Sequence, residues 1–246
     1  MSNEKSNFPE CTIGDGAIIA QSCVMGKNCK IGNKVIIHPN VVLYDNTEIG
    51  DFVEIFENSV IGRPPKSPGN LIHKLKDEYK PVIIGNNTVV GAGVVIYAEN
   101  QIANNVLLGD NACLRECCIV EEYCLIARFV TTNHHVTIRH HSKIMDNSHI
   151  TAYSVVEDSV FIGAGIITTN DTNMRLTGQE VGEKGGITFR SGCRIGSGAI
   201  FLPGITVGEN AVISVGAIVN RDVPPNTTVF ATPAKYVGVK LQEEIE

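Results

Sequence analysis

The sequence predicts an all-β protein, a parallel β-helix wound from six-residue units, and three observations support this fold class. An apolar anchor recurs at every sixth position in residues 13–61, 84–168 and 189–219, giving nine, fifteen and six units, thirty in total. Glycine directly follows many of these anchors, where a tight turn needs unusual backbone angles. Only 6% of the residues are aromatic although 43% are hydrophobic, which favours a core too narrow for most rings. Each unit should be a short strand and a turn, and the stacked units form the β-helix.

Two insertions interrupt the repeat, at about 63–82, rich in proline and charge, and at about 171–186, after a polar Thr-Thr-Asn-Asp stretch at 168–171. A solenoid accepts insertions only at its corners, and such loops commonly bind ligands, so both are candidate functional segments and the second is the better one. Residues 224–246 lose the repeat and are expected to form a cap that ends in a short helix near 241–246. The whole chain is expected to be a single β-helix domain.

Six of the eight cysteines fall four positions after an anchor, in a narrow inward slot that accepts small side chains. We expect them to pack in the core rather than to form disulfides. The adjacent pair Cys117 and Cys118 also lacks the spacing of a zinc knuckle. The six are Cys11, Cys23, Cys29, Cys118, Cys124 and Cys193.

Charge and hydropathy exclude two classes of partner. A formal net charge of -6 leaves no broad basic surface for nucleic acid. No stretch approaches the roughly 20 apolar residues of a membrane span, and the polar start of the chain lacks the apolar core of a signal peptide. The sequence therefore predicts a cytoplasmic protein with neither a nucleic-acid nor a membrane partner.

The six-residue repeat resembles that of the hexapeptide-repeat superfamily, in which three units make one triangular coil of a left-handed β-helix. The resemblance implies about ten left-handed coils, so that residues eighteen apart stack on one edge of the prism. Such a polar stack can serve as an active site or as a polar interface between subunits. One edge carries Glu116, His134, Ala152 and Asn170, with Cys117, His135, Tyr153 and Asp171 beside them; a second carries Asp110, Arg128, Asp146 and Ala164; the third carries Glu122, His140 and Asp158.

Three short elements narrow the resemblance, together with an insertion after Ile61 and Gly62 that is followed by residues 83–87. The elements are Leu114, Arg115 and Glu116; residues 143–147 followed by His149, Ile150 and Thr151; and residues 168–171. In these elements the chain is similar to the N-acetyltransferases of nucleotide-linked amino sugars, most closely those acting on dTDP-3-amino-3,6-dideoxyhexoses.

This resemblance implies an acetyl-CoA-dependent N-acetyltransferase that requires no metal, acts as a homotrimer and supplies O-antigen or surface polysaccharide biosynthesis. Amino sugar and CoA would lie in the groove between neighbouring subunits, where the amine attacks the thioester directly. An amino-sugar ammonium should titrate near roughly 8, so its neutral form costs only about 1 kcal/mol at pH 7 and needs no strong base. Groups that position the amine and stabilise the oxyanion should outweigh a general base.

The candidate catalytic residues are Asn170 and Asp171, which would hold the amine, and His134, the best imidazole candidate. Glu116 is expected to bind the sugar or to orient His134. Asn147 and His149, on a different edge, could face Asn170 across the subunit interface. Residues assigned to substrate binding are Glu116, Arg115, Asn133, Asn147, His149, Tyr153 and Arg175.

CoA is expected along the C-terminal coils, where small corner residues permit close approach of its pantetheine to the backbone. The family's Gly-x-Pro-Ala-Lys/Arg turn near the CoA nucleotide reads Ala-Thr-Pro-Ala-Lys at 231–235, without the glycine. Arg221 and Lys235 can still offer charge to the 3'-phosphate. Residues assigned to CoA binding are Ser197, Ala199, Gly216, Ala217, Arg221 and Lys235.

Other acceptors and other classes stay open. The acceptor could be a UDP-linked or 4-amino sugar, and the acyl group larger than acetyl, because one prism serves many substrates. A γ-type carbonic anhydrase would bind zinc through histidines such as His135 and His140. A third histidine two coils before His135 would fall at position 99, which is Glu99. A non-catalytic hexapeptide-repeat subunit would bind only protein partners, and it would not need the break at 168–171.

Overall fold

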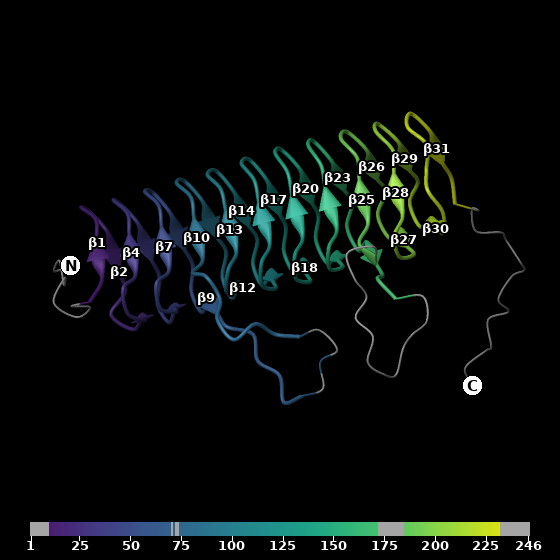
Figure 1. Cartoon of the computed structure of the whole chain (residues 1–246). Helices are drawn as coiled ribbons and strands as arrows, with labels where there is room; N and C mark the ends of the chain where they lie inside the picture. Colours follow the sequence, from purple (N-terminus) through teal and green to yellow (C-terminus); the bar gives the residue numbers. More distant parts are fainter. Residues whose placement is uncertain (1–9, 70, 72–73, 172–184, 232–246) are drawn as a thin grey trace, which may run out of the picture.

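The computed structural model describes residues 10–69, 71, 74–171 and 185–231, and within them the chain forms a β-helix of 31 short parallel strands without any helix. Each coil takes one strand from each of three sheets, here called sheets A, B and C. The sheets hold ten, eleven and ten strands, so ten coils are complete and β31 begins another. The β-helix is left-handed, and both the fold class and the number of coils expected from the sequence are confirmed (Figure 1).

The strands are two to four residues long, and their bounds follow sheet by sheet. Sheet A consists of β1 (Thr12–Ile13), β4 (Lys30–Ile31), β7 (Glu48–Ile49), β10 (Ile83–Ile84), β13 (Gln101–Ile102), β16 (Ile119–Val120), β19 (Thr137–Ile138), β22 (Val155–Val156), β25 (Thr188–Phe189) and β28 (Thr206–Val207). Sheet B consists of β2 (Ile18–Ile19), β5 (Ile36–Ile37), β8 (Glu54–Ile55), β11 (Val89–Val90), β14 (Leu107–Leu108), β17 (Leu125–Ile126), β20 (Lys143–Ile144), β23 (Phe161–Ile162), β26 (Arg194–Ile195), β29 (Val212–Ile213) and β31 (Thr228–Val229). Sheet C consists of β3 (Val24–Met25), β6 (Val42–Leu43), β9 (Val60–Arg63), β12 (Val95–Tyr97), β15 (Cys113–Leu114), β18 (Thr131–Thr132), β21 (His149–Ile150), β24 (Ile167–Thr168), β27 (Ile200–Phe201) and β30 (Ile218–Val219).

The anchors of the repeat form the core. In coil after coil the second residue of the strand points inward and is buried, as at Ile37, Ile55 and Ile126, while the residue before it faces outward. The core nevertheless admits two rings near its C-terminal end, where Phe189 and Phe201 are fully buried and meet edge to face at 5.2 Å. The prism is therefore narrow enough to favour aliphatic anchors but wide enough for an isolated aromatic pair.

The cysteines behave as the repeat predicts. All eight are free thiols, and five of the six assigned to the inward slot are buried, while Cys11, in the first described coil, is half-buried against the core. Burial raises the pKa of the Cys118 thiol to about 12, so this thiol remains protonated at neutral pH. Core packing without disulfides is thus confirmed.

The corners between strands follow two rules. The third corner residue adopts a left-handed φ in most coils, even where it is a bulky residue such as Tyr123 (φ 60°) or His135 (φ 57°). At the second corner position, an Asp or Asn side chain accepts the backbone N–H of the corresponding residue one coil earlier, at 2.6–3.0 Å. We call this series the corner ladder. Its members are Asn33, Asp45, Asp51, Asn86, Asn104, Asp110 and Asp146.

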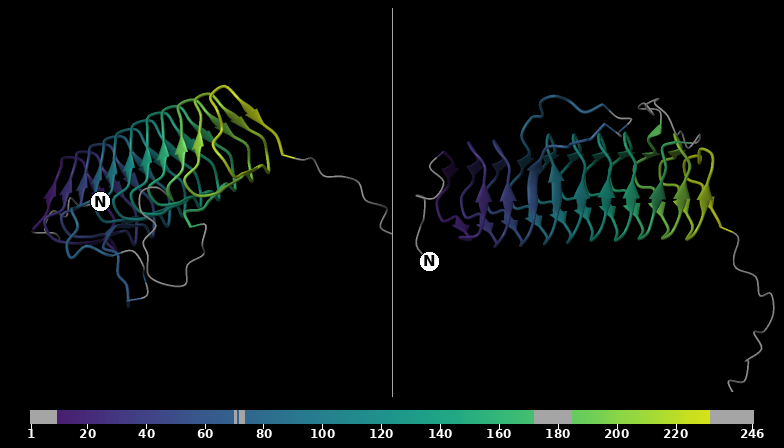
Figure 2. Two further views of the ribbon diagram at one scale, coloured as in Figure 1. Left: turned by 45° about the vertical axis from the view of Figure 1, so that its right-hand side comes forward. Right: turned by 90° about the horizontal axis from the view of Figure 1, so that it is seen from below.

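Both insertions leave the prism at the corner between sheets C and A, here called the C–A edge. The first follows β9 and precedes β10, the second follows β24 and precedes β25, and Figure 2 shows the described part of the first insertion, in blue, projecting from the prism. The strand register continues across each gap, since β7 pairs with β10 and β22 pairs with β25. The structure confirms the predicted position of both breaks, although residues 172–184 of the second lie outside the described residues.

The C-terminal segment corrects one expectation. Residues 224–231 do not leave the coil, because β31 pairs with β29 and Val223 bridges to Val207. Val229 pairs with Ile213, sixteen positions earlier instead of the usual eighteen, so the repeat is shortened by two residues here. A six-residue count of the sequence therefore misses β31. The expected short helix near 241–246 lies outside the described residues. The described part of the chain contains no helix of the length and apolarity that crossing a bilayer requires.

Candidate active site

The C–A edge stacks the predicted polar residues on successive coils. The backbone N–H of His135 donates to Glu116 O at 3.1 Å, and that of Tyr153 donates to His134 O at 3.2 Å. Glu116, His134 and Tyr153 thus occupy three consecutive coils, as the eighteen-residue spacing predicts.

Two histidines and a tyrosine form a compact ring cluster on this edge. His134 Nδ1 lies 3.0 Å from His135 Nδ1, so one of the two rings donates a hydrogen bond to the other. The His135 ring stacks on Tyr153 at 5.1 Å, and His134 meets the same tyrosine edge-on at 5.1 Å. In the tautomer in which His134 Nδ1 donates, its Nε2 carries the lone pair that can accept a proton. This tautomer requires the Nδ1 of His135 to accept the hydrogen bond, and the sequence places His135 beside His134 but does not assign it to the site.

A buried ion pair lies one coil below the histidines. Arg115 Nε and Nη2 each donate to the Glu116 carboxylate at 2.8 Å, and Glu116 is only 1% exposed. Burial by itself raises the pKa of the Glu116 carboxyl, but the hydrogen bonds and charge of Arg115 more than offset this and bring the pKa below its ordinary value. Glu116 is thus an ionised carboxylate close enough to His134 for their charges to interact. Of the two roles expected for Glu116, this burial supports orienting His134 rather than binding the sugar.

Asn100 holds this part of the edge from inside the core. It is fully buried, and its amide donates to Tyr97 O at 2.7 Å and to Arg115 O at 3.0 Å, while its carbonyl accepts the N–H of Cys118 at 3.1 Å. Strand β12 is irregular at Tyr97, where its pairing with β9 shifts register. The contact from Asn100 to the Tyr97 carbonyl follows the pattern of other coils, as from Thr47 to the Tyr44 carbonyl at 2.7 Å. Sequence reasoning did not single out Asn100. Its signal is a large amide in a slot that otherwise takes small side chains.

Tyr97 in turn carries two guanidinium groups. Arg63, at the root of the first insertion, and Arg115 each lie 5.4 Å from the Tyr97 ring centroid, within cation–π distance. Neither Arg63 nor Tyr97 was a sequence candidate. The two residues are paired across β9 and β12 only because the register shifts at Tyr97, and a six-residue count does not predict this shift.

The first insertion folds back onto the C–A edge through Lys76. Lys76 Nζ contacts both carboxylate oxygens of Glu99, at 2.9 and 3.0 Å, and lies 3.6 Å from Cys117 Sγ. Burial by itself raises the pKa of Glu99, but the hydrogen bonds from Lys76 and from the Lys80 backbone N–H, together with the charges of both lysines, outweigh burial and lower it. Sequence reasoning did not find Lys76, because a contact made by a loop follows no repeat.

Two threonines fix the backbone that leads to Asn170 and Asp171. Thr168, buried at an anchor position, accepts the N–H of Thr151 at 2.6 Å and donates to His149 O at 2.8 Å. Thr169 donates to Phe201 O at 2.9 Å. Asn170 occupies the second corner position but takes no part in the corner ladder within the described chain. Its half-buried amide is therefore not committed to holding two coils together.

Other predicted substrate-binding residues lie away from this cluster within one protomer. His149 is on the outward side of β21, where its Nδ1 is 2.8 Å from Thr131 Oγ1 and burial lowers its pKa. Asn147 lies at the corner between sheets B and C, here called the B–C edge. Asn133, by contrast, directly precedes His134. Arg175 and Lys235 lie outside the described residues.

The predicted CoA residues occupy the C-terminal coils. Ala199 and Ala217 are buried, so only their backbone can face a ligand. Gly198 and Gly216 have φ of 71° and 69° on the B–C edge, with nothing in the protomer within 4 Å of an added Cβ. Together with Ser197 they present an open strip without large side chains. Arg221 is exposed on the C–A edge.

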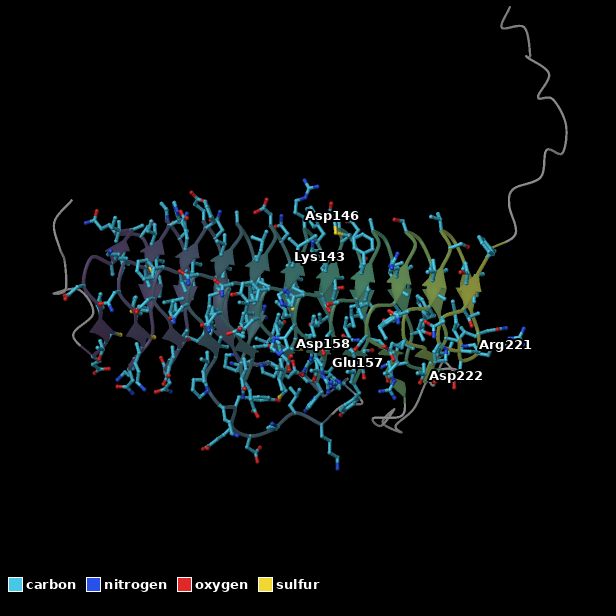
Figure 3. All side chains as sticks on the ribbon, turned by 90° about the horizontal axis from the view of Figure 1, so that it is seen from above. Lys143, Asp146, Glu157, Asp158, Arg221 and Asp222 are labelled. Atoms are coloured by element: carbon cyan, nitrogen blue, oxygen red, sulfur yellow. The ribbon has the colours of Figure 1, made fainter. Side chains whose placement is uncertain are left out.

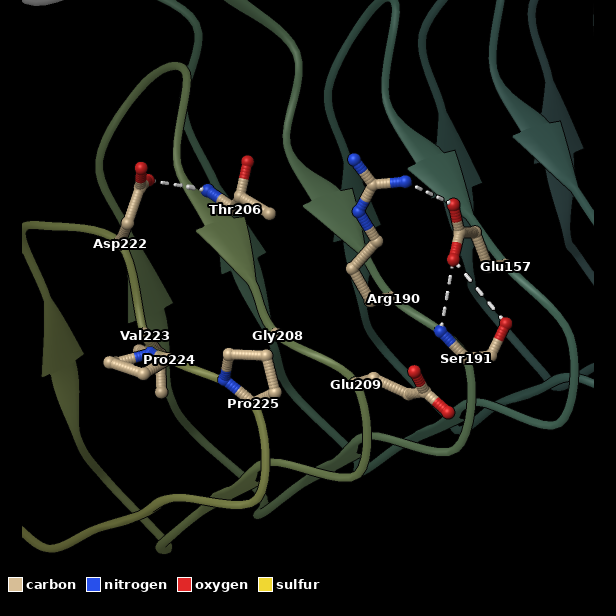
Figure 4. Close-up of a pocket in the computed structure, with 10 residues that line it drawn as sticks. All are labelled: Glu157, Arg190, Ser191, Thr206, Gly208, Glu209, Asp222, Val223, Pro224 and Pro225. Atoms are coloured by element: carbon tan, nitrogen blue, oxygen red, sulfur yellow. Dashed lines mark hydrogen bonds and ion pairs between the residues drawn. The ribbon is translucent and has the colours of Figure 1, made fainter.

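A surface pocket of about 640 Å³ lies on the outer side of sheet A near the C-terminal end (Figure 4). Its one arginine, Arg190, already pairs with Glu157 at 2.7 Å, and Glu209 and Asp222 add further negative charge. This lining does not suit the phosphates of CoA.

The residues of the carbonic anhydrase alternative do not converge in the protomer. His135 lies on the C–A edge, whereas His140 lies at the corner between sheets A and B, here called the A–B edge. No group of metal-ligating side chains in the described residues contains both.

Two descriptions of known families match parts of the chain. "Bacterial transferase hexapeptide (six repeats)" matches residues 28–63, and "Hexapeptide repeat of succinyl-transferase" matches residues 79–98 and 191–221. The matched segments lie along the β-helix on both sides of the candidate site.

Curated relatives share about a third of the chain. The galactoside O-acetyltransferase of Escherichia coli is 32% identical over 94 residues, 34% of this chain and 46% of the relative. A serine acetyltransferase of Buchnera aphidicola is 36% identical over 85 residues, 32% of this chain and 31% of the relative. The match thus spans less than half the length of either relative. Among solved structures, the UDP-N-acetylglucosamine acyltransferase of Francisella novicida aligns over 89% of this chain and 66% of its own, with 19% identity and a TM-score of 0.40.

Proposed function

Because the chain carries the hexapeptide repeats of this transferase family, we propose that it is an acetyl-CoA-dependent N-acetyltransferase of a nucleotide-linked amino sugar, with a dTDP-3-amino-3,6-dideoxyhexose as first choice. The observation that carries the proposal is the ring pair His134 and His135 above the buried Arg115–Glu116 ion pair, on the edge from which both insertions leave. Relatives named as acetyltransferases support the reaction class.

In the proposed reaction the neutral amine attacks the thioester carbonyl. A C–N bond forms, the tetrahedral intermediate collapses, and the CoA thiolate leaves. The nitrogen loses one proton, which His134 Nε2 accepts and then gives to the thiolate, so that no net charge is left behind. Asn170 and Asp171 are the groups proposed to hold the amine, and the charge of Glu116 stabilises the imidazolium of His134 while it holds the proton.

CoA is proposed to run along the open strip at Ser197, Gly198 and Gly216, where its pantetheine can reach backbone groups. Arg221 and Lys235 are proposed to meet its 3'-phosphate. The assembly proposed is a homotrimer with the site in the groove between subunits, which would bring Asn147 and His149 of one protomer toward Asn170 of the next. The protein is proposed to act in the cytoplasm, where acetyl-CoA is made.

A hydroxyl acceptor is the second candidate. The similarity to a galactoside O-acetyltransferase favours it, as does the histidine pair, because a hydroxyl is far less acidic than an ammonium and needs a base to attack. A neutral amine attacks without a base, and His134 accepts its proton only after the C–N bond has formed.

A mass-spectrometric acetylation assay tests the proposal. Acetyl-CoA is offered with a panel of dTDP- and UDP-linked 3-amino and 4-amino sugars and with a galactoside. A gain of one acetyl on one amino sugar, with kcat/KM well above the other acceptors, supports the proposal and identifies the substrate. Acetylation of the galactoside alone supports the second candidate. Binding of CoA without any acetylation would refute both acceptors, and absence of CoA binding would refute the acyltransferase class.

A further inference from the structure

Three metal-ligating side chains converge on the A–B edge, away from the candidate active site. Glu121, His140 and Asp158 come from three successive coils, and one ligand atom from each lies within 4.8 Å of the others. His140 Nε2 is 2.9 Å from Glu121 Oε2. Asp158 projects from the prism beside Glu157, on the side opposite Asp146 (Figure 3).

Asp158 breaks the rule of the corner ladder. It occupies the second corner position, where its Oδ1 should accept the N–H of His140, as Asp146 accepts the N–H of Arg128 at 3.0 Å on the B–C edge. No such bond forms. Oδ1 of Asp158 is instead the only buried side-chain oxygen or nitrogen in the described residues without a hydrogen-bond partner. A buried carboxylate oxygen without a donor is costly, and its usual explanation is an ion or a water that belongs at the site.

The charges around the trio do not balance. Neighbouring Glu157 is neutralised by Arg190 at 2.7 Å and by the N–H of Ser191 at 3.1 Å. Glu121 and Asp158, in contrast, form no ion pair with a lysine or arginine in the described part of the chain. Two carboxylates are thus left facing one imidazole, which is a donor set for a cation.

We propose that Glu121, His140 and Asp158 bind a divalent transition-metal ion, with Zn²⁺ as the committed choice. One imidazole and two carboxylates suit zinc rather than Mg²⁺ or Ca²⁺, which prefer oxygen ligands alone. Tetrahedral ligands about 2.1 Å from zinc lie about 3.4 Å apart. The trio therefore needs only a small rotation of its carboxylates to close on an ion, and water completes the fourth position. An ion held by three coils ties the middle of the prism together, and this site does not depend on the proposed acetyl transfer.

The chain contains a matched control with the same residue types. On the B–C edge His38 Nε2 meets Glu54 at 2.8 Å, and its Nδ1 meets Glu57 at 3.5 Å. Because each carboxylate takes a different ring nitrogen, the two oxygens do not converge on one point. His38 is therefore paired as an ordinary surface histidine, and its removal should not affect zinc.

The test is a titration of tag-free, chelator-treated protein with Zn²⁺ by calorimetry, repeated with Co²⁺ to read the visible absorption of a tetrahedral ion. We expect one ion per chain, and affinity at least tenfold weaker in His140→Ala and in the near-isosteric Asp158→Asn, with His38→Ala equal to the wild type. Zinc should raise the Tm of the wild type and not that of the His140 and Asp158 variants. Thermal unfolding without metal shows that each variant is folded.

Three outcomes overturn the proposal. These are absence of stoichiometric binding by the wild type, unchanged affinity in both His140→Ala and Asp158→Asn, and a loss of affinity in His38→Ala as large as that in His140→Ala. If Mn²⁺ bound more tightly than Zn²⁺ and its binding were lost in His140→Ala and Asp158→Asn, the three ligand residues would stand but the choice of zinc would be refuted.

Discussion

Replacing Asn100 tests how the interior of the prism supports the candidate active site. In Asn100→Ala two groups lose their partners at once, the carbonyl of Tyr97 and the N–H of Cys118, while the Arg115 carbonyl keeps the Cys118 thiol as a donor at 3.2 Å. Each unsatisfied buried group costs about 1–3 kcal/mol, so we expect a loss of about 2–4 kcal/mol in the free energy of unfolding once some relaxation is allowed.

Serine at the same position should recover most of this loss. The corresponding slot on the A–B edge, before β20, holds Ser142, whose single hydroxyl donates to Glu157 O at 2.6 Å and accepts the N–H of Val160 at 3.1 Å. These carbonyl and N–H groups lie fifteen and eighteen residues ahead, as Arg115 and Cys118 do from Asn100. Asn100→Ser therefore leaves only the Tyr97 carbonyl unpaired and should cost about 1–2 kcal/mol.

The measurement is equilibrium unfolding in urea for the wild type and both variants. Asn104→Ala, a half-buried member of the corner ladder, is a control expected to lose less than about 1 kcal/mol. Equal destabilisation by alanine and serine would refute the hydrogen-bond reasoning, because it would mean that side-chain volume alone matters at position 100.

Four further predictions concern the edge and the core. His135→Asn keeps a residue that tolerates left-handed φ, and it should lower kcat about tenfold or more because the His134 tautomer is no longer held by the second ring. His141→Asn, at the corresponding position on the A–B edge and stacked on Tyr123 at 5.0 Å, should leave kcat unchanged. Equal effects of the two changes on kcat would contradict the tautomer role. Asn170→Ala and Asp171→Ala should each lower turnover while sizing chromatography shows the oligomer of the wild type, and full activity in both would remove them from the site. Because the pKa of Glu116 is lowered in the folded protein, its ion pair adds stability above the unfolded pKa, near 4.3, and this stability is lost as pH falls through the lower folded pKa. The Tm difference between the wild type and Glu116→Gln should therefore be largest at neutral pH and vanish in acid. A Tm difference that does not depend on pH would contradict this. Cys118→Leu should overpack the slot between coils and cost about 1–3 kcal/mol in thermal unfolding, whereas an unchanged Tm would show that position 118 does not point inward.

The repeat explains why so much of the fold could be predicted from the sequence. Strand pairing joins residues eighteen apart throughout the uninterrupted coils, so the stack of Glu116, His134 and Tyr153 follows from counting alone. Where the period slips, counting fails. The two-residue phase change before β31 concealed a strand in the segment expected to be a cap.

Side-chain contacts that no period encodes could not be predicted. The contact between His134 and His135 depends on how two adjacent rings turn at a corner, and Lys76 reaches Glu99 from a loop of irregular sequence. Asn100 could have been found as the one large amide in a small-residue slot, and Asp158 only by comparing its side chain with the other members of its column.

Both insertions leave the same edge of the prism, so the number of coils between them sets the distance between the points where they leave it. From β9 to β24, sheet C advances by five strands, and at about 4.8 Å per strand the two insertions leave the prism about 24 Å apart. Duplication of any one coil between them would lengthen this gap by a single step of about 4.8 Å without altering a residue of either insertion. The spacing of the two insertions is therefore set in whole coils, and so is the number of C–A edge residues that lie between them.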